Sequence, residues 1–333
     1  MNYKKWIDFW LENYIKPSSK DKTYWNYKSI SKTHIINRFG QCELNEITPM
    51  KVQEYINDLM SKGNKITNRG LSINTINLII TILQSSIKTA YLSNELKAYN
   101  LSNIRRPHIE ERNVNCFSLE EQKNIEYFVL HSKKKKMLGI IICLYTGLRI
   151  GELLALTWDD IDLEKRLISV TKTCHDGKNQ LGEYQRIINS PKTFSSRRTI
   201  PFPKQLLIVF ETLKELSSKY VISNNKENIS IRSYQRSFTL LLKRIGIKHK
   251  GFHSLRHTFA TRSIEYGMDV KTLSEILGHK NAAITLNRYV HSLLEHKKEM
   301  MDKVGNLLTT KNCVLECTYN DILDEHNSII TSD

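Results

Sequence analysis

Six side chains between positions 149 and 289 have the types needed for chemistry on a phosphate. Arginine can grip two phosphate oxygens at once, lysine and histidine can transfer protons, and a tyrosine hydroxyl can act as a nucleophile. Taken singly, an arginine is usually a surface charge and a histidine a structural hydrogen-bonding residue, but the whole set predicts phosphoryl transfer. The six residues are Arg149, Lys192, His253, Arg256, His279 and Tyr289.

The local sequence predicts how four of these side chains are presented. In "HSLRH", His253 and Arg256 are three residues apart and therefore share one face of a helix. In "TGLRIGE", Arg149 follows a glycine turn at the start of a helix, where backbone N–H groups attract anions. In "ILGHK", His279 follows Gly278, a residue type that commonly ends helices. All four are thus expected at helix faces or helix ends.

The lysine and the tyrosine are expected on other elements. Lys192, in "SPKTFSSRRTIP", falls at a turn between two predicted strands, from which it can reach across a groove. Tyr289, in "LNRYV", falls on a short helix that follows His279. The site is therefore expected to draw its side chains from several elements.

A metal centre is a second interpretation of the histidines. His253, His257 and His279 could be ligands, but no acidic residue lies at a ligand-like spacing and the neighbouring arginines would repel a cation. The chain also lacks the G-x-x-x-x-G-K-[ST] loop that binds nucleotide phosphates. We therefore expect neither a metal nor another cofactor.

The elements around these residues read as a mixed domain. Ser118 followed by Glu121 is a capping pattern that opens a helix. Three β-branched stretches, "RLISVTK", "YQRIINS" and "SRRTIPF", predict one small antiparallel sheet. The chain then reads as helical to about Gly305.

The first hundred residues read as four helices. Thr48 is suited to cap the third helix, with Pro49 at its first position. Aromatic residues of the first helix recur at helical spacing, and we interpret them as core. These residues are Trp6, Phe9, Trp10 and Tyr14. The predicted helices span 4–16, 22–39, 47–63 and 73–92.

The chain of 333 residues is long enough for two domains. Residues 101–116 are charged, contain Pro107 and lack periodicity, which is typical of a linker. We therefore expect a helical domain over 1–100, this linker, a second domain over 117–305 and a separate segment over 306–333.

Charge is spread unevenly over these parts. The whole chain has 50 Lys and Arg against 34 Asp and Glu, a net +16 that indicates a polyanionic partner such as nucleic acid. Residues 105–300 have 34 basic and 20 acidic residues, or +14, whereas 301–333 have 2 basic and 6 acidic residues, or −4. The acidic segment must therefore have a different role.

Other compositional features indicate the compartment. The six cysteines are scattered, which is typical of a reducing environment. The N-terminus "MNYKKWIDFW" lacks the apolar region of a signal peptide, and the longest apolar run, "MLGIIICLY", is too short to span a bilayer. We therefore expect a cytoplasmic protein with no membrane partner.

Three segments resemble the tyrosine recombinases, the integrase family of phages and conjugative transposons. They are "TGLRIGELLALTWDDID", "PKTFSSRRTIPFP" and "HSLRHTFATRSIEYGMDVKTLSEILGHKNAAITLNRY". The resemblance covers about 118–290, and the preceding helices resemble the family's core-binding domain. It implies a mainly α two-domain fold, with a helical core-binding domain and a mixed α+β catalytic domain that holds a small antiparallel β-sheet.

The resemblance also implies roles for the six residues. Tyr289 would attack the scissile phosphate and form a 3′-phosphotyrosyl bond, with His253 assisting as base. Arg149 and Arg256 would stabilise the transition state. In addition, Lys192 would protonate the leaving 5′ oxygen and His279 would hold a phosphate oxygen.

The implied partners are double-stranded DNA core sites and other copies of the chain. A bacterial or phage-encoded enzyme of this kind would be a monomer when free and a homo-tetramer on DNA, aided by accessory DNA-bending or directionality proteins. The chain begins a few residues before its core-binding helices, which favours action on core sites without an arm-binding domain. In the family, a segment such as 306–333 docks on a neighbouring protomer. We therefore expect it to pack in trans in the DNA-bound tetramer or to fold back in cis when no partner is present, and the alternative is a frayed tail.

Two other functions share parts of this pattern. A type IB topoisomerase would use the same catalytic residue types to relax DNA. A helix-turn-helix regulator would use the stretch around Gly267, which has the spacing of that motif, but would not need Tyr289 or Lys192.

Overall fold

The computed structural model describes most of the chain. Described residues are 1–64, 67–99, 101–108, 115–178, 182–189, 197–215, 218–224 and 227–279, together with 281, 283, 285, 298 and 301–306. The chain forms two compact units. The first comprises 1–113, 174–189 and 230–232, and the second comprises 114–173, 190–229 and 233–333.

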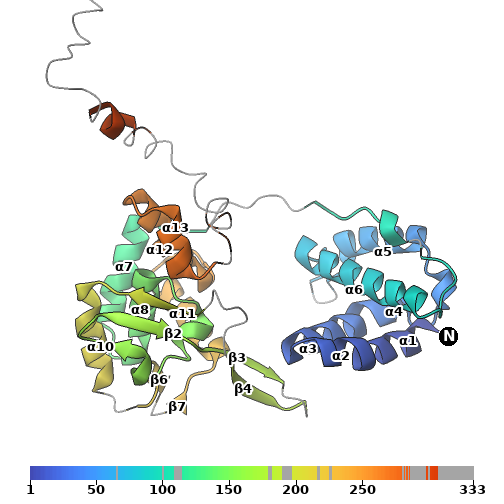
Figure 1. Ribbon diagram of the computed structural model, residues 1–333, viewed down its shortest axis with the longest axis horizontal. Coiled ribbons are helices and arrows are strands. Elements are labelled where there is room, and N and C mark those ends of the chain that lie inside the picture. The colour runs from blue at the N-terminus through green and yellow to red at the C-terminus, as the bar shows by residue number, and fades with distance from the viewer. Residues whose placement is uncertain are drawn as a thin grey trace, which may run out of the picture. The chain divides into compact units, whose positions relative to one another are not determined.

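The first unit contains the four predicted helical segments (Figure 1). The third begins as predicted, because the Thr48 hydroxyl accepts a hydrogen bond from the Lys51 N–H and Pro49 occupies the first turn. The first segment is α1 (Tyr3–Trp10), which continues through a π-helical stretch (Leu11–Ile15) into α2 (Lys16–Ser18). The second is α3 (Asp21–Ile30), which continues through a second π-helical stretch (Ser31–Ile35) into α4 (Ile36–Phe39). The third and fourth are α5 (Pro49–Lys62) and α6 (Ile73–Leu92).

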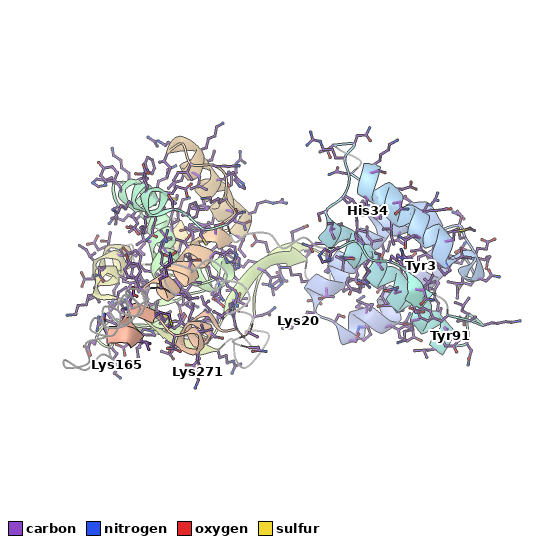
Figure 2. The ribbon with its side chains drawn as sticks, turned by 90° about the horizontal axis from the view of Figure 1, so that it is seen from above. Tyr3, Lys20, His34, Tyr91, Lys165 and Lys271 are labelled. Atoms are coloured by element: carbon purple, nitrogen blue, oxygen red, sulfur yellow. The ribbon has the colours of Figure 1, made fainter. Side chains whose placement is uncertain are left out.

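The aromatic residues of α1 pack against α6. Trp6 and Trp10 are buried, and their indole N–H groups donate to the Ser86 carbonyl and the Thr89 hydroxyl at 3.0 and 3.1 Å. Tyr3, labelled in Figure 2, is also buried and its hydroxyl lies 2.7 Å from that of Ser86. The polar tips of these three aromatic side chains are therefore all satisfied. The expectation was wrong for two residues, since Phe9 and Tyr14 are 50% and 41% exposed.

The second unit surrounds the apolar helix α8 with further helices (Figure 1). Ser118 and Glu121 form the predicted capping box at the start of α7. Helix α8 ends at Gly147, which adopts the left-handed conformation with φ +66°. The helices are α7 (Leu119–Leu130), α8 (Leu138–Thr146), α9 (Ile150–Leu153), α10 (Leu207–Lys214), α11 (Ile231–Arg244), α12 (His253–Glu265) and α13 (Val270–Leu277).

The strands form three small antiparallel sheets within the described residues, where the sequence predicted one. Strands β1 (Ile161–Asp162), β2 (Leu167–Val170) and β5 (Arg198–Pro201) form a sheet in the order β1-β2-β5. The stretch "YQRIINS" does not join it. It forms β4 (Tyr184–Asn189) and pairs instead with β3 (Thr173–Lys178), while β6 (Ser223–Asn224) pairs with β7 (Glu227–Asn228).

The register of β2 and β5 fixes which side chains enter the interior. Ile168 lies opposite Ile200 and Val170 lies opposite Arg198. Ile168, Val170 and Ile200 are all buried. Because residues two apart on a strand share a face, Arg198 points toward the same interior as Ile200. Among the described residues, no helix is long and apolar enough to cross a membrane.

Candidate active site

Arg256 is buried at the centre of the second unit. It lies one turn into α12, which packs on α8, and only 2% of its surface is exposed. Its Nη1 donates to the Gly147 carbonyl at 2.8 Å and its Nη2 donates to the Leu277 carbonyl at 2.6 Å. A buried charge is tolerated only when it is well paired, so these contacts fix the guanidinium in one place.

His279 lies directly beside Arg256, as a shared site requires. Gly278 ends α13 with φ +64°, and the His279 N–H donates to the Ser274 carbonyl at 3.0 Å in the helix-ending pattern that the left-handed glycine allows. The Nε2 of His279 is 3.0 Å from the Nη2 of Arg256, and its Nδ1 is 2.7 Å from the Thr285 hydroxyl. A guanidinium only donates, so Nε2 is the acceptor in this arrangement.

Arg149 joins the same cluster from the start of α9. Its backbone N–H and its Nη1 donate to the two oxygens of Glu152 at 2.9 and 2.8 Å. Its side chain is 36% exposed, in contrast to the buried side chain of Arg256. The helix that follows Arg149 is the short helix α9 (Ile150–Leu153).

Two residues that we did not single out from the sequence complete this cluster. Arg198, at the start of β5, donates from Nη1 and Nη2 to the two oxygens of Glu152 at 3.1 and 2.9 Å. The two side chains are 6% and 4% exposed. The available signal was the alternation in "RRTIP", which places Arg198 on the same face as Ile200 and therefore requires a buried partner.

The surroundings of Glu152 favour the ionised form of its carboxyl. Burial by itself would raise the pKa of its carboxyl, but the hydrogen bonds and charge of Arg198, with the charge of Arg149, lower that pKa from 4.5 to about 2. The carboxylate therefore bridges two guanidinium groups and carries a full negative charge between them.

Three arginines meet at the end of α13. The last carbonyls of a helix have no partner within it, and here each of three consecutive carbonyls accepts from a different arginine. The positive charges also face the negative end of the helix dipole, which favours them. The pairs are Arg198 Nε with Ile276 O at 2.5 Å, Arg256 Nη2 with Leu277 O at 2.6 Å and Arg149 Nη2 with Gly278 O at 3.4 Å.

Of the other three predicted residues, the structure describes only His253. His253 is the first residue of α12, and its ring lies edge-on to that of His257 with centroids 4.5 Å apart. Lys192 and Tyr289 lie outside the described residues. Within the described part of the chain, no group of three His, Cys, Asp or Glu side chains is arranged to hold a metal ion.

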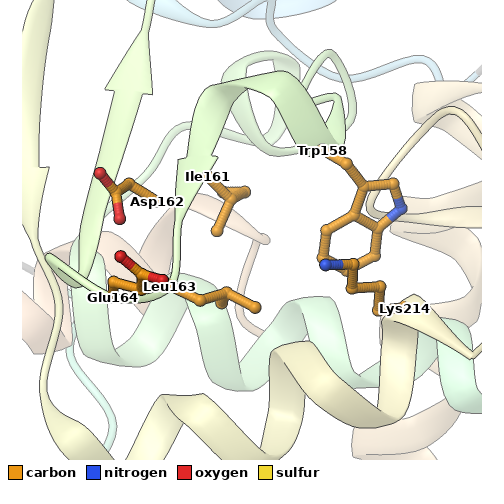
Figure 3. A pocket seen from close by; sticks show the side chains of 6 residues that line it. All are labelled: Trp158, Ile161, Asp162, Leu163, Glu164 and Lys214. Carbon is orange, nitrogen blue, oxygen red and sulfur yellow. The ribbon is translucent and has the colours of Figure 1, made fainter.

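A hollow of about 540 Å³ lies elsewhere in the second unit. In Figure 3 the carboxylates of Asp162 and Glu164 lie at one side of it, and Trp158 and Lys214 face each other at the other. None of the six predicted residues lines it. The described residues with phosphate chemistry therefore lie at α9, α12 and the end of α13, and none of them lines this hollow.

Comparison with known protein families identifies the family of this chain. The model of the phage integrase family matches residues 120–296, which include Arg149, Arg256 and His279. The chain belongs to the phage integrase family. A second model, the N-terminal SAM-like domain of phage integrases, matches residues 2–60.

Relatives of this integrase span most of its length. It is 29% identical over 324 residues to a tyrosine recombinase XerC-like protein of Caldanaerobacter subterraneus subsp. tengcongensis, covering 90% of this chain and 81% of the relative. It is 28% identical to the ICEBs1 integrase of Bacillus subtilis, covering 87% of this chain and 79% of that protein. The integrase is therefore a tyrosine recombinase, an enzyme for site-specific cleavage and rejoining of DNA.

Solved structures share the fold of this integrase. The Tn1549 transposon integrase, in complex with transposon right end DNA, superposes with a TM-score of 0.75 at 23% identity, covering 92% of this chain and all of that one. A lambda integrase dimer bound to a COC′ core site gives a TM-score of 0.67 at 19% identity, covering 87% and 77% of the two chains. The predicted fold class, a mainly α two-domain fold, is confirmed, with three small sheets among the described residues in place of the one predicted.

Proposed function

We propose that this recombinase integrates or excises a mobile element by cutting double-stranded DNA at core sites through a covalent link to Tyr289. The observation that carries the proposal is the convergence of Arg149, Arg256 and His279 at the end of α13. Arg256 is buried and fixed, whereas Arg149 is 36% exposed, so a phosphate can approach from the side of Arg149. The Tn1549 and lambda integrase complexes with DNA support the choice of ligand.

In the proposed reaction, Tyr289 attacks the scissile phosphorus while His253 assists as base. The two arginines stabilise the charge that develops on the non-bridging oxygens. Lys192 gives a proton to the 5′ oxygen as the bond to it breaks, and a 3′-phosphotyrosyl link remains. Attack by the 5′-hydroxyl of a partner strand then releases Tyr289 and joins the new strands, so that the reaction requires neither ATP nor a metal.

The parts of the chain have separate roles in this proposal. Residues 1–100 bind the core site, 101–116 link the domains, 117–305 catalyse strand exchange, and the acidic segment 306–333 docks on a neighbouring protomer. The active form is a homo-tetramer on DNA assembled from free monomers, with accessory DNA-bending or directionality proteins, in the cytoplasm of a bacterial host. A lambda integrase tetramer bound to a Holliday junction supports this assembly.

The proposal is tested by trapping the covalent link. Wild type and Tyr289→Phe are incubated with labelled duplexes from the element's ends, and products are separated on a denaturing gel. Wild type should give a protein–DNA band, and Tyr289→Phe should bind the duplex equally well but give no band, because only the hydroxyl is removed.

A matched control removes a hydroxyl elsewhere. Tyr266 follows α12 and is 83% exposed, so Tyr266→Phe should retain the covalent band. The same reactions in EDTA should still give the wild-type band, since arginines supply the charge that a metal supplies in other nucleases. A covalent band from Tyr289→Phe would move the nucleophile to another residue.

A further inference from the structure

Arg198 is a buried charge for which the reaction above has no use. It enters the interior from β5, and its side chain is 6% exposed. Placing an ion there is costly unless other groups hold it, and Arg198 is held on two sides. Its Nη1 and Nη2 form a fork on Glu152, and its Nε donates to the Ile276 carbonyl at 2.5 Å.

The first of these links leads to Arg149. Glu152 accepts from Arg198 with both oxygens, and the same oxygens accept from the Nη1 and the backbone N–H of Arg149. A carboxylate shared in this way holds Arg149 by one edge and leaves its Nη2 pointing toward the end of α13. Without Arg198, Glu152 would be a buried carboxylate with Arg149 as its main cation, and it would draw that guanidinium inward.

The second link leads to His279. Ile276 lies three residues before His279, and its carbonyl is one of the three at the end of α13 that accept from arginines. Gly278 packs closely on the Arg198 side chain, since a Cβ added there would lie 3.0 Å from the Arg198 Cδ. Arg198 therefore supports the turn that places His279 next to Arg256.

Charge balance favours the same role. The cluster of Arg149, Arg198, Arg256 and Glu152 has a net charge of +2, and a pentavalent phosphorane has two formal negative charges where the phosphodiester has one. Loss of Arg198 would reduce the cluster to +1 and weaken its preference for the transition state over the ground state.

We propose that Arg198 is a positioning residue for strand cleavage, which acts through Glu152 on Arg149 and through the end of α13 on His279. Arg198 does not touch the DNA. The inference rests on the proposed function, because it assumes that Arg149 and His279 contact the scissile phosphate.

The test uses a substrate whose transition state has less negative charge for the protein to stabilise. A synthetic duplex from the element's end is made with a normal phosphate or with a methylphosphonate at the scissile position, where a methyl group replaces one charged oxygen. Arg198→Met should cleave the phosphate duplex about 10- to 100-fold more slowly than wild type, by analogy with the loss seen when a group that orients a metal ligand is removed. On the methylphosphonate duplex most of that deficit should disappear, because less charge remains to be stabilised.

The matched control is an arginine with similar contacts outside the cluster. Arg262 on α12 is bonded to Glu265 and donates to the Phe117 carbonyl at 3.1 Å. Arg262→Met removes the same groups and should cleave both duplexes at wild-type rates. Equal losses for Arg198→Met on both duplexes, or no loss on either, would overturn the inference.

Two further variants keep the result interpretable. If Arg198→Met does not fold, Arg198→Lys retains a cation but loses the two-pronged bond to Glu152, and it should show the same difference between substrates to a smaller degree. Arg149→Met tests the proposed function itself, since it should be slow on phosphate and recover on methylphosphonate. If Arg149→Met recovers and the Arg198 variants do not, only the inference on Arg198 is wrong, whereas failure of Arg149→Met to recover would count against the proposed function.

Discussion

At the residue scale, the difference between arginine and lysine decides how this cluster works. Arg256 reaches the Gly147 carbonyl, the Leu277 carbonyl and the His279 ring at the same time, with donors on two different nitrogens. A lysine has one nitrogen on a flexible stem and cannot occupy the same fork. The geometry of the guanidinium, and not its charge alone, therefore holds α8, α12 and the end of α13 together.

Arg256→Lys and Arg149→Lys are therefore expected to abolish most cleavage. Removing one preorganised donor to a transition-state oxygen typically costs about 10²- to 10³-fold in rate. Arg256→Lys should also lower the melting temperature, because its acceptors are buried, whereas Arg149→Lys should alter it less. The measurements are covalent-band formation with time and thermal unfolding, and near-normal cleavage by both variants would contradict the assigned roles.

The pKa of Glu152 predicts how the stability of the protein depends on pH. Its folded-state pKa is about 2 against an ordinary 4.5, so the ionised form is favoured in the folded protein. A depressed carboxyl pKa contributes stability that is present above about 4.5 and is lost as the pH falls toward 2. The difference corresponds to about 3 kcal/mol in the free energy of unfolding.

The measurement compares wild type with Glu152→Gln by urea unfolding across this range. The stability advantage of wild type should be about 3 kcal/mol larger at pH 6 than near pH 2. A carboxyl NMR titration gives an independent value, and Arg198→Lys should move the midpoint of Glu152 upward. A midpoint near 4.5 in the wild type would contradict the bridging role of this carboxylate.

At the element scale, the sequence predicts helices far better than strand partners. The four helices of the first unit follow from apolar spacing and from caps such as Thr48, because these signals lie within each helix. Strand pairing depends on residues distant in the chain. The partner of β4 is "TCHDGK", which has few β-favouring residues and gave no strand signal.

The candidate site shows the same limit. Arg149, Arg256 and His279 stand out because turns and helix ends mark them in the sequence. Arg198 does not, since its neighbour Arg197 has the same residue type but is exposed. The alternation in "RRTIP" puts the two arginines on opposite faces of the strand, and the pairing of β5 with β2 then shows which face is the interior. The carbonyls at the end of α13 that accept from the three arginines are likewise identified only once the helix end is located.

The turn after α13 can be tested with two glycines. Gly278 and Gly246 both have positive φ, at +64° and +71°. A Cβ at Gly278 would lie 3.0 Å from Arg198, whereas nothing lies within 4 Å of one at Gly246. Alanine at either position should cost about 1 kcal/mol or more through backbone strain.

Only Gly278→Ala is expected to slow cleavage, because it also displaces Arg198 and the turn that holds His279. Rates of covalent-band formation should be compared at a temperature where both variants are fully folded by circular dichroism. Equal rates for the two variants would show that the turn does not position the site.

At the scale of the whole molecule, charge separates the parts of the chain. The excess of +14 over 105–300 predicts that binding to DNA releases many counterions. Affinity for a core-site duplex, measured by fluorescence anisotropy, should fall about 10³- to 10⁵-fold between 50 and 200 mM salt if six to ten phosphates are contacted. A flat response would indicate that the basic surface serves a protein partner instead.

The acidic segment has the opposite charge and its own test. Residues 306–333 have 1 basic and 5 acidic residues, a net charge of −4, and contain apolar residues such as Val314, Leu315, Ile322 and Leu323 among the acidic ones. Apolar side chains interspersed with acidic ones suit a surface that is itself partly apolar and basic, which the domain of +14 on a neighbouring protomer supplies. Truncation after Asn306 should therefore leave binding to a single core site intact, or strengthen it slightly through the loss of negative charge, while reducing the complex of two sites on a native gel.

Replacing the four apolar residues with serine keeps every acidic charge, so this variant separates the contribution of the apolar contacts from that of the charge. The serine variant should assemble as poorly as the truncated protein if apolar contacts dominate. Recombination by the truncated protein at the wild-type rate would show that the segment does not couple protomers.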